Sequence, residues 1–219
     1  MKIFLDTADY NAIAHWAQTG ILDGITTNPT NLSKEGNEPK KNIQAICALL
    51  PHGVISVEVV ETEPEAIYKQ AHALFDLADN VAVKIPCHKD YYGIIKRLVN
   101  EGVRLNITLV FSLIQGLMMA KLGVEYISPF IGRIDDFGGN GLELIKQLRA
   151  MLDRYQFATK LLAASIRNMS HFEGAVIEGA DVATLPVKVL EQATSHVLTD
   201  QGIEKFLKDW QTLGIKQFP

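Results

Sequence analysis

A lysine interrupts an apolar, β-branched stretch in the first half of the chain. Residues 81–86 read Val-Ala-Val-Lys-Ile-Pro, and such a run predicts a buried strand that ends at the proline. A solvated lysine is almost fully protonated at pH 7, whereas a lysine kept neutral in a dry site can attack a carbonyl carbon and form a Schiff base. Lys84 is therefore a candidate nucleophile. The alternatives are a lysine that reaches solvent from the strand end, or one in a structural ion pair.

Polar and ionisable residues recur at or just after the ends of other strand-like segments. Side chains alternate between the two faces of a strand, so residues 105–109 turn Asn106 and Thr108 to one face, and residues 56–59 turn Ser56 and Glu58 to one face. The other candidates of this kind are Asp6, Thr26, Asn28, Ser128, Arg133, Ser165 and Arg167, and the apolar Phe130 is expected on the same face as Ser128.

A lysine, two acids and two arginines on one face suggest a reaction. An imine between Lys84 and a ketone would accept the electrons of an adjacent C–C bond, while a carboxylate takes the proton of the neighbouring hydroxyl. Glu58 or Asp6 could be this base, directly or through a water held by Thr108. Arginine pairs bind phosphate well, so a phosphorylated substrate is expected. The six histidines show no HxH or HExxH pattern, so we expect no metal and no cofactor.

Each of these residues also has a purely structural interpretation. Asp6 could cap the first helix, and the pair Asn28-Pro29 is common at turns and helix starts. Glu58 could simply neutralise Lys84. Arg133 and Arg167 could each form surface salt bridges. Their convergence on one face is what favours the functional interpretation.

The elements that must position these residues are eight strand-like segments separated by stretches with helical spacing. The expected strands are 3–6, 24–28, 54–60, 81–86, 105–110, 126–131, 161–166 and 182–186. The expected helices are 9–18, 40–50, 65–77, 92–100, 112–122, 141–155 and 170–177, with a segment at 187–194 and a C-terminal helix at about 200–213. Capping boxes are expected at two helix starts, Thr62 with Glu65 and Ser170 with Glu173.

Eight such units close most simply into a (β/α)₈ (TIM) barrel of the α/β class, and no linker or composition break divides residues 1–219. The alternative is a doubly wound open sheet. It is disfavoured because residues 6–9 read Asp-Thr-Ala-Asp after the first strand, in place of a glycine-rich phosphate turn. Barrel enzymes keep their chemistry at the carboxyl ends of the strands, where the candidate residues lie.

The composition excludes several partners and compartments. The formal charge of −4 without basic clusters argues against nucleic acid and against an anionic membrane surface. Cys47 and Cys87 form no ligand spacing, so they are interpreted as reduced thiols. We expect no signal peptide and no membrane span, and hence a cytoplasmic protein.

At these residues the sequence resembles the transaldolase family, particularly its short members, over nearly the whole chain. Residues 24–30, Gly-Ile-Thr-Thr-Asn-Pro-Thr, are similar to the second-strand motif of that family, and residues 81–86 to its Schiff-base lysine strand. Further segments that match are 106–112, 128–133 and 164–168.

The resemblance implies a role for each candidate. Lys84 would carry the Schiff base, and Glu58 would do acid/base work through a water ordered with Thr108. Asp6 would bind or deprotonate substrate hydroxyls. Asn28 and Asn106 would hold the dihydroxyacetone unit, and Ser165, Arg133 and Arg167 the phosphate.

The resemblance also implies the substrates. The donor would be sedoheptulose 7-phosphate or fructose 6-phosphate, and the acceptor glyceraldehyde 3-phosphate or erythrose 4-phosphate, in pentose-phosphate metabolism. A homo-oligomer, a pentamer or decamer, is expected. The C-terminal helix, with Phe206, Leu207 and Trp210 on one side, could cover the barrel or dock on a neighbour.

Close relatives of short transaldolases act as fructose-6-phosphate aldolases, and two positions separate them. Those aldolases typically have Gln in place of Glu58 and Tyr in place of Phe130, so both residues here are of the transaldolase type. Cleavage would leave the dihydroxyacetone unit bound to the lysine as an enamine. A tyrosine hydroxyl could protonate this enamine and let water release the dihydroxyacetone, whereas a phenyl ring cannot. Departures from the family motifs are Asn31, where an apolar residue is usual, and His88 and Tyr91 after the lysine strand.

Two further hypotheses remain open. A phosphosugar isomerase or epimerase could use Glu58 as base and Lys84 as an electrostatic stabiliser. A non-catalytic phosphate-binding barrel could hold Lys84 and Glu58 as a static pair.

Overall fold

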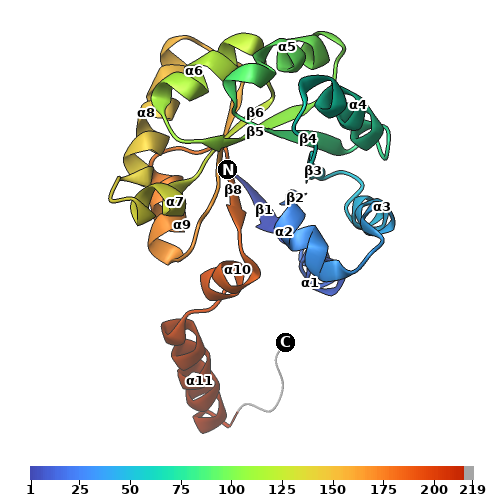
Figure 1. Cartoon of the computed structure of the whole chain (residues 1–219). Helices are drawn as coiled ribbons and strands as arrows, with labels where there is room; N and C mark the ends of the chain where they lie inside the picture. The colour runs from blue at the N-terminus through green and yellow to red at the C-terminus, as the bar shows by residue number, and fades with distance from the viewer. Residues whose placement is uncertain (215–219) are drawn as a thin grey trace.

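Eight parallel strands form a closed barrel in the computed structural model, which describes residues 1–214 of the chain (Figure 1). Each strand pairs with the next along the chain, and β1 pairs with β8 to close the ring. This confirms the predicted single-domain (β/α)₈ barrel. The strands are β1 (Lys2–Asp6), β2 (Gly24–Thr26), β3 (Val54–Glu58), β4 (Val81–Pro86), β5 (Leu105–Val110), β6 (Tyr126–Pro129), β7 (Lys160–Ala163) and β8 (Val182–Leu185).

Helices cover the outside of the barrel, as Figure 1 shows. Those of the successive units are α1 (Tyr10–Ala17), α3 (Pro39–Leu49), α4 (Pro64–Phe75), α5 (Tyr92–Asn100), α6 (Leu113–Leu122), α8 (Gly141–Arg154), α9 (Met169–Ile177) and α10 (Val187–Ala193). Two short helices, α2 (Pro29–Leu32) and α7 (Ile131–Asp136), begin just after β2 and β6, and two 3₁₀ turns are η1 (Ser33–Glu35) and η2 (Lys89–Tyr91).

The alternation of side chains gives the barrel two apolar layers. Val81, Val83 and Ile85 of β4 pack outward into the large core between strands and helices. Ala82 faces inward, into a small cluster that fills the barrel interior with Phe4 and other buried side chains. Lys84 shares the inward face of Ala82 but lies one step closer to the carboxyl end. The interior is therefore apolar below and polar at the carboxyl mouth, as the sequence predicts.

Strands β2 and β6 end earlier than expected because the cap of α2 and the first residue of α7 fall within the predicted segments. The strand expected at 24–28 stops at Thr26, since the side chain of Asn28 caps α2 by accepting a hydrogen bond from the Asn31 N–H at 2.8 Å. The strand expected at 126–131 stops at Pro129, and Ile131 opens α7. Both boundaries lie at the mouth, where the candidate site residues are.

Neither predicted capping box forms. The residue before α4 is Glu63, which makes no side-chain capping bond. The cap of α9 is Asn168, whose side chain accepts from the His171 N–H at 2.9 Å. Asp6 caps no helix either: the cap of α1 is Asp9. The Asp6 carboxylate is therefore not committed to a helix cap and can take part in contacts at the barrel mouth.

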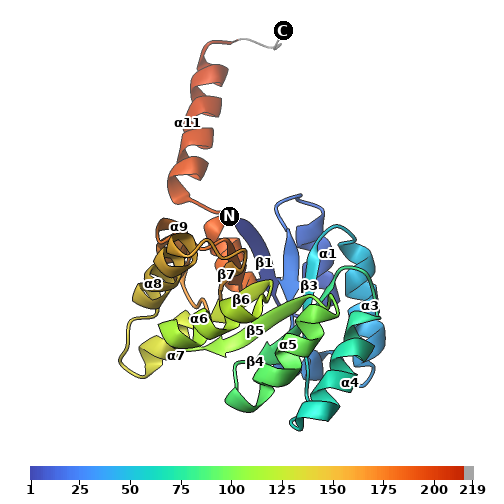
Figure 2. The ribbon, with the colours of Figure 1, turned by 90° about the horizontal axis from the view of Figure 1, so that it is seen from above.

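The C-terminal helix α11 (Val197–Thr212) begins three residues earlier than predicted and projects away from the barrel (Figures 1 and 2). None of its residues is buried. Its exposed apolar side chains include Val197, Leu198, Ile203, Phe206 and Leu207. Because an apolar helix face is normally buried against another element, this face is available for a partner.

Candidate active site

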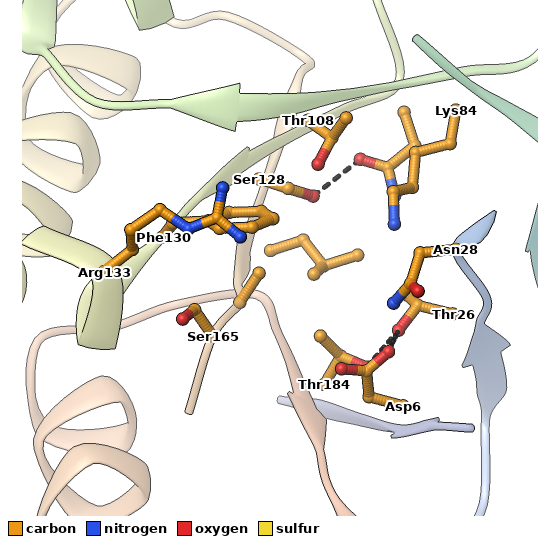
Figure 3. A pocket seen from close by; sticks show the side chains of 13 residues that line it. Asp6, Thr26, Asn28, Lys84, Thr108, Ser128, Phe130, Arg133, Ser165 and Thr184 are labelled. Atoms are coloured by element: carbon orange, nitrogen blue, oxygen red, sulfur yellow. Dashed lines mark hydrogen bonds between the residues drawn. The ribbon is translucent and has the colours of Figure 1, made fainter. Parts of the chain in front are cut away.

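A cavity of about 170 Å³ opens at the carboxyl ends of the strands (Figure 3). Its lining joins side chains that are far apart in the sequence: Asp6, Thr26, Asn28, Lys84, Asn106, Thr108, Ser128, Phe130, Arg133, Leu162, Ala164, Ser165 and Thr184. A second cavity of about 420 Å³ lies beside it and shares part of this lining, while adding Pro29, Thr30, Asn31, Glu58 and Leu109. The structure thus gathers ten of the twelve sequence-predicted site residues around the first cavity and Glu58 around the second.

Lys84 is buried and held at its tip by two oxygens. Its Nζ donates to the Thr27 carbonyl oxygen at 2.8 Å and lies 3.0 Å from Glu58 Oε2. The pairing of β3 with β4 places Glu58 directly beside Lys84, so the ion pair follows from the strand register. The side chain of Lys84 is 7% exposed and that of Glu58 is 14% exposed. The amine is therefore fixed at the cavity wall with a carboxylate in contact.

Asp6 lies at the end of β1 and is tied to its neighbours by hydroxyl groups. Thr26 Oγ1 donates to Asp6 Oδ1 at 3.1 Å and lies 2.6 Å from Thr184 Oγ1. Burial raises the pKa of the Asp6 carboxyl above its ordinary value, and the charge of Lys84 and the Thr26 bond only partly oppose this shift. A carboxyl with a raised pKa is suited to exchanging a proton near neutral pH.

A chain of hydrogen bonds fixes the amide of Asn106. Ser128 Oγ donates to Asn106 Oδ1 at 2.6 Å, and Asn106 Nδ2 donates to Ser56 Oγ at 3.1 Å. All three side chains are buried. With one N–H committed to Ser56, the second N–H of the Asn106 amide is available to an oxygen of a ligand.

Thr108 has a buried hydroxyl without a hydrogen-bond partner in the described part of the chain. It lies two residues after Asn106 on β5, on the same face of the strand, and lines the same cavity. A buried polar group without a partner is costly. The Thr108 hydroxyl is therefore placed to bind a water or a substrate atom.

The two arginines differ in position. Arg133, on α7, lines both cavities, and its guanidinium lies 5.0 Å from the centroid of the Phe130 ring (Figure 3). Arg167 lines neither cavity and forms a two-pronged ion pair with Asp136 at the end of α7. This pair lowers the pKa of Asp136. Arg167 therefore anchors the helix that carries Arg133.

The backbone at the mouth is strained at two positions, one near the end of β5 and one just after β7. Leu109 and Ser165 each have φ of 57°, in the left-handed region that non-glycine residues rarely adopt. At Leu109 the register of β5 against β6 shifts, so its side chain turns to the second cavity, while Ser165 turns to the first. Such strain is often found at functional sites.

Sequence reasoning missed seven residues that line the two cavities, of which Thr184 and Asn31 bear on the chemistry. Thr184 lies inward with Val182 on β8, so the alternation applied to the other strands would have found it. Asn31 donates to Asp6 Oδ1 at 3.3 Å, and only its departure from the resembled motif marked it. Leu162 and Ala164 add apolar wall.

No group of three or more His, Cys, Asp or Glu in the described residues could hold a metal ion. Within residues 1–214, no helix is long and apolar enough to cross a membrane.

The fold and the cavity define a class of protein. It is a (β/α)₈ barrel with a buried lysine–carboxylate pair at the carboxyl mouth, where characterised barrel enzymes keep their chemistry. A family model described as "Transaldolase/Fructose-6-phosphate aldolase" matches residues 3–216, and the chain belongs to this family.

Curated relatives agree with this assignment. The chain is 45% identical over 217 residues to a "Probable transaldolase" of Lactiplantibacillus plantarum, covering 99% of this chain and 100% of the relative. It is 46% identical over 214 residues to a "Probable transaldolase" of a Caulobacter species, covering 98% of each. It is 43% identical over 217 residues to a "Probable transaldolase 2" of Listeria monocytogenes, covering 99% of each. These names support an enzyme of the transaldolase type.

Proposed function

We propose that this chain is a transaldolase that moves a dihydroxyacetone unit between sugar phosphates through a Schiff base on Lys84, without a cofactor. The observation that carries the proposal is the buried Lys84 amine, 3.0 Å from the Glu58 carboxylate and exposed to a polar cavity. The donor is sedoheptulose 7-phosphate or fructose 6-phosphate, and the acceptor is glyceraldehyde 3-phosphate or erythrose 4-phosphate. The cytoplasmic pentose phosphate pathway is the proposed setting, with residues 1–219 as one domain, of which 215–219 lie outside the described residues.

The proposed reaction begins when Lys84 Nζ attacks the ketone carbon of the donor and water leaves to give an imine. A carboxylate then takes the proton of the hydroxyl on the far side of the scissile C–C bond. As that bond breaks, its electron pair enters the imine and leaves an enamine, and the aldose phosphate departs. The enamine carbon attacks the acceptor aldehyde, and water releases the new ketose from Lys84.

The geometry supports a division of labour between the acids. Glu58 is in contact with Lys84, which lines the same cavity as the unpartnered Thr108 hydroxyl, and this suits proton transfers during imine formation through a water. Asp6 lies apart from this pair on β1 and has a raised pKa, which suits the hydroxyl proton of the donor. Asn28, Asn106 and Ser128 would hold the hydroxyls of the three-carbon unit. Thr26 would support Asp6 through its hydrogen bond to Oδ1.

In this proposal Arg133 and Ser165 bind the phosphate, which is supported by their position in the cavity lining at the side away from Asp6 (Figure 3). Arg167 would have to release Asp136 to bind phosphate itself. Its direct contact with phosphate therefore stays a proposal that rests on the resemblance alone, whereas its tie to α7 is seen in the contacts.

The test of the proposed function is covalent trapping. Wild-type protein incubated with fructose 6-phosphate and borohydride is expected to gain the mass of a reduced three-carbon unit, and peptide mapping is expected to place it on Lys84. Gain of an intact six-carbon phosphate would show imine formation without cleavage. No mass gain would sink the Schiff-base mechanism and favour an isomerase with Glu58 as base.

The second candidate is fructose-6-phosphate aldolase, which the family description also names. Phe130 favours transfer over it, because the cavity wall at this position offers no hydroxyl to protonate the enamine. An assay without acceptor discriminates: an aldolase releases free dihydroxyacetone from fructose 6-phosphate at the full turnover rate.

We also propose that α11 joins copies of this chain into a pentamer or decamer. The helix projects from the barrel with an apolar face that includes Phe206 and Leu207, respectively 71% and 57% exposed. Light scattering is expected to give a multiple of the chain mass of 24.2 kDa. Replacing Phe206 and Leu207 by serine is expected to lower that multiple, and a wild-type mass of one chain would refute the proposal.

A further inference from the structure

Asn31, on the short helix α2, connects that helix to the catalytic acid at the end of β1. Its backbone N–H donates to Asn28 Oδ1 at 2.8 Å. Its side-chain Nδ2 donates to Asp6 Oδ1 at 3.3 Å. The backbone of Asn31 is thus held by the helix cap, while its side chain reaches the Asp6 carboxylate. It lines the second cavity but not the first, so it acts on Asp6 from behind.

Both donors to Asp6 approach the same oxygen. Thr26 Oγ1 and Asn31 Nδ2 donate to Oδ1, and in the described part of the chain no hydrogen bond engages Oδ2. Since Thr26 gives its single proton to Asp6, the hydrogen bond between Thr26 and Thr184 must be donated by Thr184. The carboxylate is therefore held by one oxygen, and the other is left for a ligand in the cavity that Asp6 lines.

We propose that Asn31 is a positioning residue, which holds Asp6 so that Oδ2 faces the substrate hydroxyl and keeps the Asp6 carboxylate ionised at the working pH. This inference rests on the proposed function, in which Asp6 takes a proton from the donor sugar. An apolar side chain at this position, as in the motif that residues 24–30 resemble, could not donate. The chain has therefore added a second donor to its catalytic acid.

The charged surroundings of Asp6 define what Asn31 adds. Across the cavity lie Lys84 on β4, with Glu58 on β3 paired to it, and Arg133 on α7. The neighbouring strands β2 and β8 present only the hydroxyls of Thr26 and Thr184, and no charged residue of α1 or α10 in the described chain lines the cavity.

Burial raises the pKa of Asp6, and the charge of Lys84 and the bond from Thr26 oppose that rise. Asn31 donates to the same oxygen as Thr26, so its bond favours the ionised carboxylate in the same way. Loss of the Asn31 bond should then raise the Asp6 pKa further. The ionised form of Asp6 is the active one in the proposed mechanism. As the pH is lowered, a variant without the Asn31 bond should therefore lose activity at a higher pH than wild type does.

The experiment is the pH profile of kcat/KM for wild type, Asn31→Leu and Asn31→Asp, with erythrose 4-phosphate as acceptor. The leucine variant removes the donor at similar volume, and its acidic limb is expected to move up by about half to one pH unit. The aspartate variant keeps the shape and adds a like charge, so a shift of about one unit or more is expected. Ionisation of the substrate phosphate is common to all variants and cancels in the comparison.

Ser33→Ala is the matched control. Ser33 Oγ donates to the Thr30 carbonyl in the same segment and has no contact with Asp6, so its acidic limb should coincide with that of wild type. A merely structural role for Asn31 would lower the melting temperature and reduce activity equally at every pH. An unmoved limb in both Asn31 variants would overturn the inference. If Asn31→Leu does not fold, the near-isosteric Asn31→Asp alone decides.

Borohydride trapping distinguishes a failure of the proposed function from a failure of the role assigned to Asn31. If wild type forms no adduct on Lys84, the proposed function itself fails. If wild type and the Asn31 variants all form the adduct but share one pH profile, the function stands and the role of Asn31 is wrong.

Discussion

Replacing Lys84 by methionine is expected to lower transaldolase turnover by at least about 10⁴-fold, since loss of a covalent nucleophile removes the pathway itself. The same change should also destabilise the barrel. It leaves the Glu58 carboxylate without its cation in a site where Glu58 is 14% exposed, and it leaves the Thr27 carbonyl without its donor. Breaking a buried ion pair from one side costs about 3–5 kcal/mol.

A double variant separates the two losses. Lys84→Met with Glu58→Gln removes the orphaned charge, so the free energy of unfolding in urea is expected to return to within about 1–2 kcal/mol of wild type. Activity is expected to stay lost, and so is borohydride trapping. A static, non-catalytic pair predicts the opposite pattern: ligand binding would persist in Lys84→Met and no reaction rate would change.

Phe130→Tyr is expected to raise the release of free dihydroxyacetone from fructose 6-phosphate by about 10²-fold, which is the usual scale of a well-placed general acid. Phe130 lines the same cavity as Lys84, with Arg133 over its ring. A phenol at this position can give a proton to the enamine carbon, after which water hydrolyses the imine. Transfer to erythrose 4-phosphate should fall correspondingly, because the enamine no longer waits for the acceptor.

Phe111→Tyr is the control for this change. The rings of Phe111 and Phe130 are in edge contact, with centroids 5.9 Å apart, but Phe111 does not line the cavity that holds Lys84. The Phe111→Tyr variant adds the same hydroxyl beside the site, but this hydroxyl does not face the enamine. Its ratio of transfer to erythrose 4-phosphate over release of free dihydroxyacetone should therefore match that of wild type. Equal release by both tyrosine variants, or by neither, would contradict the role assigned to Phe130.

The sequence predicted the strands well because their pattern is local. Short apolar or β-branched segments that recur along the chain identified all eight strands, and the alternation of side chains within them directed Asn106, Thr108 and Lys84 into one cavity. It failed at the strand ends. Helices α2 and α7 are of four and six residues, too short to show a helical period, so the predicted strands extend to Asn28, the cap of α2, and to Ile131, the first residue of α7.

The ion pairs and networks of the site could not be read from the sequence. Arg167 is expected in a phosphate clamp by resemblance, yet its guanidinium is held by Asp136, a partner 31 residues away in the chain. The sequence marks Asn31 only as a departure from the resembled motif, because its bond to Asp6 joins residues 25 positions apart in the chain. Partners of this kind are fixed by tertiary packing, which no local pattern encodes.

The closure of the barrel by β1 and β8 affects when the site comes into being during synthesis. Asp6 lies on the first strand of the barrel, but Thr184, which completes its hydrogen-bonded support through Thr26, lies on the last strand, where it pairs with Phe4. Lys84 and Glu58 are already present on the adjacent strands β3 and β4 of a half-made chain. The growing chain therefore carries the proposed nucleophile well before the support of Asp6 is complete, and the whole cavity forms only after the eighth strand has been synthesised.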